Sequence, residues 1–222
     1  MRYLVCNGSP RGDAGFTAVL IRQFVAGLRE AGVQADILLI DNPARHAEAA
    51  ERLAEADVAV VFFPLYTDAM PGILLPVIEH MEPYRGNLQG HTLGFVVHSG
   101  FPEAVHGRAV ARYLDRLAAL LGVDYAGTAV LGGNPWSKKR MHAVHALGRR
   151  FVPAGHRFDP AMLAEAAFRD KFRTSELFLL RPLAALGVFN RYFNGQLRKN
   201  GVFERRFDQP YAPDAAIRPK DE

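Results

Sequence analysis

Three polar side chains near the start of the chain, those of Ser9, Arg11 and Thr17, have the chemistry to bind a phosphate group. Two hydroxyl groups and one planar, forked guanidinium offer hydrogen-bond donors that suit phosphate oxygens. All three lie in or next to residues 7–15, a polar segment rich in residues that break a strand. Their types and spacing predict an anion site that is built on a loop.

The elements on either side of this loop follow from the hydrophobic pattern. Residues 3–6 are an apolar run rich in strand-forming side chains, which predicts a short buried strand. After Thr17, large apolar residues recur at helical spacing and charged residues take the opposite face. The loop therefore leads into the positive end of a helix dipole, where free backbone N–H groups attract an anion.

Two common nucleotide-binding patterns do not occur in this loop. The Walker pattern needs a lysine after its second glycine, and the first lysine of the chain is Lys138. The dinucleotide pattern G-x-G-x-x-G fails because Gly8 is followed by Ser9 and Pro10. A loop that encloses one terminal phosphate remains, and the simpler alternative is an ordinary strand-to-helix turn capped by Thr17.

The segment 7–17, NGSPRGDAGFT, resembles the phosphate loop of the flavodoxin-like NAD(P)H-dependent FMN reductases, part of the wider NAD(P)H-dependent oxidoreductase family. Members of that family bind FMN, a monophosphate. The resemblance implies that Ser9, Arg11, Phe16 and Thr17 contact FMN. Phe16 departs from the family pattern, since many relatives carry a small polar residue at that place.

A second unusual loop, PLYTDAMPG at residues 64–72, follows the unbroken apolar run 58–63. It resembles the segment that holds the flavin ring in the same reductases. Backbone N–H groups of such a turn can stabilise negative charge on a reduced flavin, and Tyr66 is expected to pack on the ring. The alternative is a tight turn with a core tyrosine. The resemblance assigns five residues of this loop to the cofactor site: Pro64, Leu65, Tyr66, Thr67 and Asp68.

A third loop follows the expected strand 91–97 and resembles the third flavin-contacting loop of the family. The resemblance places Ser99 and Gly100 near the ring edge and the ribityl chain, and Phe101 over a ring face. For Phe101, a buried core position is the alternative. His98 and His106 are candidates for proton relays near neutral pH, with an ordinary structural role as the alternative.

Strands that alternate with helices at this spacing predict an α/β fold, a flavodoxin-like doubly wound five-stranded parallel sheet with a C-terminal helical extension. The flavodoxin-like FMN-binding domain is expected over residues 1–155, with a helical extension and tail over 156–222. Pro76 lies inside the expected helix 73–84, so that helix either starts late or kinks. The other expected elements are strands at 33–40 and 124–131 and helices at 17–30, 47–56, 103–121, 138–151 and 160–172.

Residues 176–199 predict one further, strongly apolar helix that Arg181 and Pro182 interrupt. Such a helix needs a covering surface, which is the domain itself, a twin subunit or a membrane interface. Ten large apolar side chains exceed what one helix hides against a finished domain. The pattern therefore favours a homodimer over a membrane contact.

Composition restricts the remaining classes. The 222 residues are 49% hydrophobic and contain one cysteine, Cys6, so an intrachain disulfide and a four-cysteine iron–sulfur cluster are excluded, and no other metal site is expected. No uncharged apolar run approaches ~18 residues, and no signal sequence is evident, so the cytoplasm is the expected location. Residues 1–111 hold 8 Arg+Lys against 12 Asp+Glu, and residues 112–222 hold 19 against 11. The basic residues are scattered, so no nucleic-acid partner is expected.

The resemblance implies hydride transfer from NADH or NADPH to FMN and then to a small-molecule electron acceptor: a quinone, a nitro or azo compound, or free flavin. The motif requires no side-chain acid or base, so no catalytic residue is predicted. Two other classes fit the same loops. One is a flavodoxin-type one-electron carrier, although such carriers are usually shorter and acidic; the other is a non-flavin module that binds a different phosphate ligand.

Overall fold

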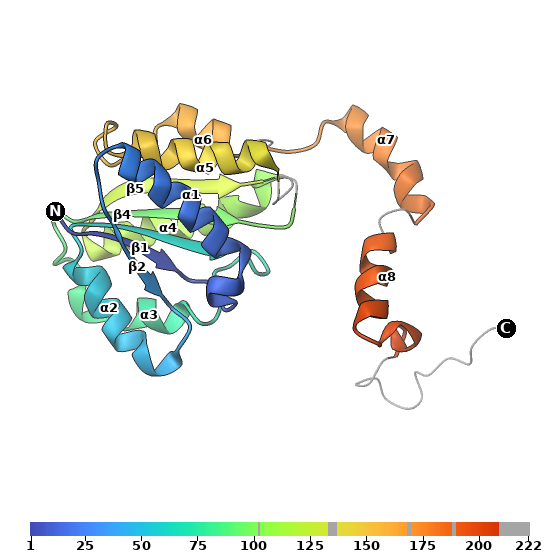
Figure 1. Cartoon of the computed structure of the whole chain (residues 1–222), viewed down its shortest axis with the longest axis horizontal. Helices are drawn as coiled ribbons and strands as arrows, with labels where there is room; N and C mark the ends of the chain where they lie inside the picture. Colours follow the sequence, from blue (N-terminus) through green and yellow to red (C-terminus); the bar gives the residue numbers. More distant parts are fainter. Residues whose placement is uncertain (102, 133–136, 168–169, 188–189, 209–222) are drawn as a thin grey trace. The chain divides into compact units, whose positions relative to one another are not determined.

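Five parallel strands form one sheet in the order β2-β1-β3-β4-β5 (Figure 1). This is the strand order of flavodoxin, so the predicted fold class is confirmed. The central strand β3 is buried along its whole length, as expected for a parallel strand covered on both faces. The strands are β1 (Tyr3–Asn7), β2 (Asp36–Leu39), β3 (Val58–Pro64), β4 (Thr92–His98) and β5 (Asp124–Leu131).

The computed structural model describes residues 1–101, 103–132, 137–167, 170–187 and 190–208. It separates into two units, Met1–Lys171 and Phe172–Glu222, which are described one at a time. These units do not test the predicted limit of the flavin-binding part at residue 155, which stays a prediction.

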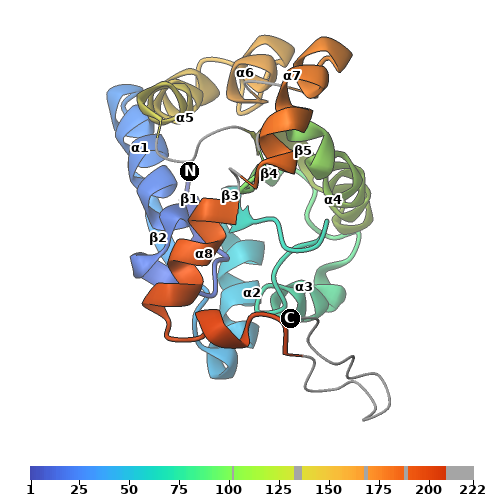
Figure 2. The same cartoon turned by 90° about the vertical axis from the view of Figure 1, so that its right-hand side faces the viewer.

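Helices cover both faces of the sheet and enclose two hydrophobic cores (Figure 2). On one face lie α1 (Phe16–Glu30), α5 (Lys138–Phe151) and α6 (Pro160–Ala167). On the other face lie α2 (His46–Glu55), α3 (Leu75–Glu79) and α4 (Arg108–Leu121). Short 3-10 turns join them: η1 (Gly12–Ala14), η2 (Pro43–Arg45), η3 (Glu82–Tyr84) and η4 (Ala104–Gly107).

Helices α1 and α5 approach until their backbones touch. A Cβ atom at Gly27 would overlap the carbonyl oxygen of His145, and one at Gly148 would overlap the carbonyl oxygen of Phe24. Only glycine permits this approach at both positions. The two helices therefore form one closely packed pair on their face of the sheet.

Pro76 sits in the first turn of α3, where its missing N–H costs no helical hydrogen bond. Of the two predicted outcomes, the late start is the one observed, and the expected helix 73–84 is reduced to α3 and the separate turn η3. The expected helix 103–121 also begins late, because η4 precedes α4.

The second unit contains α7 (Thr174–Ala185), α8 (Asn190–Lys199) and the turn η5 (Phe203–Arg205). The prediction of one helix over 176–199 with a break at Pro182 is wrong. Pro182 lies inside α7, and the chain leaves that helix at Leu186 and Gly187, where Gly187 takes a positive φ of 68°. Within the described residues, no helix is long and apolar enough to cross a membrane.

Candidate functional site

The carboxyl ends of β1, β3 and β4 lie side by side at one edge of the sheet. Asn7 pairs with Phe62, and Pro64, the buried last residue of β3, pairs with His98. The loops that follow these strands therefore meet, and all three contain predicted site residues. The strand order reverses between β1 and β3, which is where an open α/β sheet binds its ligand.

The first loop is held by the side chain of Asn7, which is 1% exposed. Its Nδ2 donates to the carbonyl oxygen of Gly12 over 3.2 Å, and its Oδ1 accepts from the backbone N–H of Ser9 over 3.1 Å. Asn7 is not among the site residues predicted from the sequence. The available signal was an asparagine at the end of a strand, whose amide can bond to the backbone two residues on.

Ser9, Arg11 and Gly15 close this loop into a small cradle. Ser9 is buried, and its Oγ accepts from the backbone N–H of Arg11 over 3.3 Å, so its own hydroxyl proton stays free to donate. A Cβ atom at Gly15 would lie 3.0 Å from the Cβ of Arg11 and 3.2 Å from Ser9 Oγ. The Arg11 side chain is exposed at the rim of the cradle.

Thr17 does not cap the helix, so the alternative of a turn capped by Thr17 is wrong. Gly15 occupies the cap position of α1, and Thr17 lies in the first turn. Its hydroxyl oxygen is 2.8 Å from Nε2 of His98. Phe16 packs edge-on against the same imidazole, with 5.4 Å between ring centroids.

His98 is uncharged at neutral pH. Burial first, and then the nearby positive charge of Arg140, lower the pKa of His98 from its ordinary 6.5 to about 3. Arg140 is itself buried, which lowers its pKa to about 10. Its guanidinium donates to the carbonyl oxygens of Leu131 and Gly132 at the end of β5. A histidine this weakly basic is a poor proton relay at pH 7.

The second loop forms a two-residue hairpin turn. Tyr66 and Ala69 exchange backbone hydrogen bonds of 2.9 and 3.1 Å. Thr67 and Asp68 between them have φ values of 49° and 61°, the pattern of a type I′ turn. A β-branched residue such as Thr67 is rare in this conformation. Tyr66 is 46% exposed, so the alternative of a core tyrosine is wrong, although the turn itself is tight.

The second and third loops are joined through the backbone N–H of Leu65, which donates to the carbonyl oxygen of His98 over 2.7 Å. In the third loop, the Oγ of the buried Ser99 bonds to the backbone of Phe101. Gly100 faces open space. Phe101 is 56% exposed and lies on the ring of His106, 4.5 Å between centroids, so the alternative of a buried core aromatic is wrong.

The family comparison decides the classification of this sheet and its loops. A family model described as having a flavodoxin-like fold matches residues 1–151. The chain belongs to this flavodoxin-like family. The membership predicted from the three loops is therefore confirmed for this flavodoxin-like protein.

Solved structures resemble this flavodoxin-like protein over about two thirds of its length. One is the Trp repressor binding protein from Bacillus subtilis, with a TM-score of 0.55, 19% identity, and coverage of 68% of this chain and 97% of that one. Another is an FMN-dependent NADH-azoreductase from Bacillus anthracis in complex with FMN, with a TM-score of 0.53, 13% identity, and coverage of 70% of this chain and 98% of that one. A third is an NAD(P)H:quinone oxidoreductase from Methanothermobacter marburgensis, with a TM-score of 0.54, 16% identity, and coverage of 68% of this chain and 96% of that one. At these identities the likeness concerns the fold.

The sequence search of curated proteins returned no match.

The residues at the sheet edge fit FMN in two respects. The cradle of the first loop presents the buried hydroxyl of Ser9 and the exposed guanidinium of Arg11, which suit a phosphate. In the other loops, Gly72 and Gly100 face open space, so a flat ring system can approach the backbone there. Within the described residues, no group of three or more His, Cys, Asp or Glu side chains is arranged to hold a metal ion.

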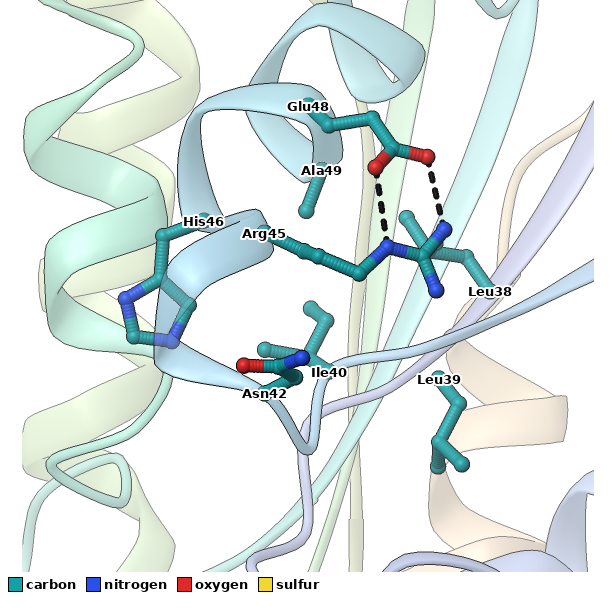
Figure 3. Close-up of a pocket in the computed structure, with 8 residues that line it drawn as sticks. All are labelled: Leu38, Leu39, Ile40, Asn42, Arg45, His46, Glu48 and Ala49. Carbon is teal, nitrogen blue, oxygen red and sulfur yellow. Dashed lines mark hydrogen bonds and ion pairs between the residues drawn. The ribbon is translucent and has the colours of Figure 1, made fainter.

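An enclosed hollow beside β2 does not compete with this site (Figure 3). Its volume is about 10 Å³, room for one water molecule. Arg45 turns toward Glu48 in a two-bond ion pair, and the buried Nε2 of His46 has no hydrogen-bond partner within the described part of the chain. A larger, open hollow of about 390 Å³ lies at the opposite edge of the sheet, near Arg2 and Arg29. None of the predicted site residues lines either hollow.

Proposed function

We propose that this protein is an FMN-dependent oxidoreductase that passes hydride from NADH or NADPH, through bound FMN, to a small electron acceptor. The acceptor is a quinone, a nitro or azo compound, or free flavin. The observation that carries the proposal is the meeting of three flavin-type loops at the point where the strand order of a flavodoxin-like sheet reverses. The azoreductase and quinone oxidoreductase among the similar structures support it at the level of the fold.

The first loop and the start of α1 are proposed to hold the FMN phosphate. Ser9 donates a hydrogen bond from its hydroxyl group, Arg11 supplies a guanidinium, and the first turn of α1 adds the positive end of its dipole. The loop is arranged in advance by Asn7, so little ordering entropy is lost on binding.

The second and third loops are proposed to hold the ring. Tyr66 offers a half-exposed aromatic face, and the turn at Thr67 and Asp68 presents backbone groups to the ring edge. Ser99 and Gly100 form the opposite edge, and Phe101 covers the entrance together with His106. Bound FMN supplies the hydride and electron transfer that no side chain provides.

The proposed working form is a homodimer in the cytoplasm. The second unit exposes several large apolar side chains, which favour a covering surface. Within the described part of residues 176–199 these are Leu177, Phe178, Leu183, Leu186, Tyr192 and Phe193, and Val202 and Phe207 follow them. A second copy of the chain is the proposed occupant, with membrane contact as the weaker alternative.

The experiment begins with the colour of the purified protein. We expect flavin absorbance bands, FMN rather than FAD in the flavin released by heat, and steady NAD(P)H oxidation when a quinone is added. Recovery of FAD would contradict the phosphate assignment. Bound flavin without NAD(P)H oxidation would indicate a one-electron carrier, and failure to take up FMN would indicate a non-flavin module.

A further inference from the structure

His98 is the residue at which the three loops of the candidate site meet. Its carbonyl oxygen accepts from Leu65 at the start of the second loop, and Ser99 of the third loop follows it directly. Its Nε2 lies 2.8 Å from Oγ1 of Thr17, which stands in the first turn of α1. Through its backbone carbonyl and its imidazole together, this one residue ties the ring end of the proposed site to its phosphate end.

The hydrogen bond between His98 and Thr17 has two possible directions with different consequences. A threonine hydroxyl carries one proton and can donate one hydrogen bond. If Thr17 donates to Nε2, it has no proton left for another acceptor. If Nε2–H donates to Oγ1 instead, the Thr17 proton is free to donate to a second group.

The surroundings determine what His98 can offer. Thr17 is 1% and His98 is 8% exposed, so water cannot replace either partner. Burial, and then the positive charge of Arg140, keep the ring neutral with its pKa at about 3, so it carries one N–H rather than two. Phe16 packs on the ring edge and restricts its rotation. The ring is therefore a fixed, single-proton group.

We infer that His98 is a positioning residue: its Nε2–H donates to Thr17 and so directs the Thr17 hydroxyl to donate to the phosphate monoester of bound FMN. The inference rests on the proposed function. Its supports in the structure are the 2.8 Å contact, the burial of both side chains and the place of Thr17 at the positive end of α1. His98 acts through Thr17 and needs no contact with the flavin.

The first test compares the dissociation constants of FMN and riboflavin, which differ in the phosphate alone. In the wild type, FMN should bind more tightly than riboflavin. His98→Leu and Thr17→Val should each weaken FMN about tenfold or more and change riboflavin less than about twofold, because a hydrogen bond to a charged group is lost. His98→Gln, whose amide can still donate to Thr17, should stay within about threefold of the wild type.

Two further variants sharpen this comparison. The double variant of His98→Leu and Thr17→Val should bind FMN no more weakly than the worse single variant, since both remove one interaction. His91→Leu is the matched control. His91 lies at the other end of β4, where its Nδ1 is 2.8 Å from the carbonyl oxygen of Ala56, and its loss should leave the FMN-to-riboflavin ratio unchanged.

The second test observes the ring directly in the wild-type complex with FMN, by long-range proton–nitrogen NMR. The neutral Nε2–H form of His98 is expected. The Nδ1–H form or an imidazolium would overturn the inference, and this result does not depend on whether His98→Leu folds. Equal losses of FMN and riboflavin affinity in the variants, or multiplying effects in the double variant, would also overturn it. A wild type that binds neither flavin would instead overturn the proposed function.

Discussion

The Nδ2 atom of Asn7 donates a hydrogen bond of 3.2 Å to the carbonyl oxygen of Gly12, and so spans the loop that follows β1. The same amide accepts from Ser9, and the side chain is almost fully buried. The shape of the proposed phosphate cradle therefore depends on a residue that need not touch the ligand.

Replacing Asn7 by alanine should open the cradle. Asn7→Ala leaves the buried N–H of Ser9 without a partner and removes one of the two hydrogen bonds to the carbonyl oxygen of Gly12, which still accepts from Gly15. This loss should lower the free energy of unfolding by about 1–3 kcal/mol and weaken FMN binding. Urea unfolding and flavin titration measure the two effects. Asn42→Ala is the control, because Asn42 makes a similar bond to Ala44 at an exposed turn. Tight FMN binding by Asn7→Ala would contradict this role.

Arg11 should contribute to FMN affinity through its charge. Arg11→Ala should weaken FMN by roughly 1.5–3 kcal/mol, the scale of a hydrogen bond to a charged group, and should leave riboflavin affinity nearly unchanged. Arg22→Ala removes another exposed arginine, on α1, and is expected to change neither the FMN affinity nor the riboflavin affinity. An unaltered FMN dissociation constant in Arg11→Ala would remove Arg11 from the phosphate site.

Tyr66 should affect the ring rather than the fold. Since its side chain is half-exposed, Tyr66→Ala should change the thermal midpoint little while shifting the redox potential or the affinity of the bound flavin. Tyr113, which is 47% exposed on α4, offers a matched control as Tyr113→Ala. Identical spectrum, potential and affinity in Tyr66→Ala would show that Tyr66 does not contact the ring.

The stability of the protein should depend on pH through His98. Its pKa is about 3 in the folded chain and 6.5 in its ordinary state, so below pH 6.5 the unfolded chain takes up a proton that the folded chain does not. The contribution of His98 is therefore present above pH 6.5 and is lost as the pH falls toward 3, by up to about 1.4 kcal/mol per pH unit. Urea unfolding of the wild type and His98→Gln between pH 7.5 and 5 should give curves that converge. Parallel curves would refute the assignment of this pH dependence to His98.

Residues 176–199 of the second unit should hold the proposed homodimer together. Sedimentation at micromolar concentration should give a mass near twice 24.5 kDa. Phe178→Glu combined with Phe193→Glu should give a monomer, because both rings are exposed and a buried charge is costly. Phe207→Glu, at an exposed position outside residues 176–199, is the control. A wild-type monomer would exclude the dimer, and one that floats with anionic vesicles would favour the membrane alternative.

Local patterns predicted the regular elements well where the pattern and its ends were both strong. The strand 124–131 and the helix 138–151 were predicted with the bounds of β5 and α5, and Ser137 caps α5 through its side chain. The prediction of one helix over 176–199 was wrong because the chain leaves the helix at Gly187, which takes a positive φ, and not at Pro182, which lies inside α7.

The location of the candidate site could be predicted from the sequence, whereas most of the contacts between its residues could not. Loop composition, which depends on local sequence, singled out the segments after residues 6, 63 and 97, and the structure brings these three loops to one edge of the sheet. The bond between Thr17 and His98 joins residues 81 positions apart, and no periodicity or spacing predicts such a pair. For the same reason, the exposure of Tyr66 and Phe101 followed only from the packed structure.

The contact of α1 and α5 through Gly27 and Gly148 has a mechanical consequence. No side chains separate the helices at this crossing, so no rotamer change can absorb a shift of one against the other. The two helices therefore move as one rigid body. Helix α1 carries Thr17 in its first turn, and α5 carries Arg140, which donates a hydrogen bond to the end of β5. A displacement of Thr17 or of Arg140 along with its helix therefore shifts both helices together.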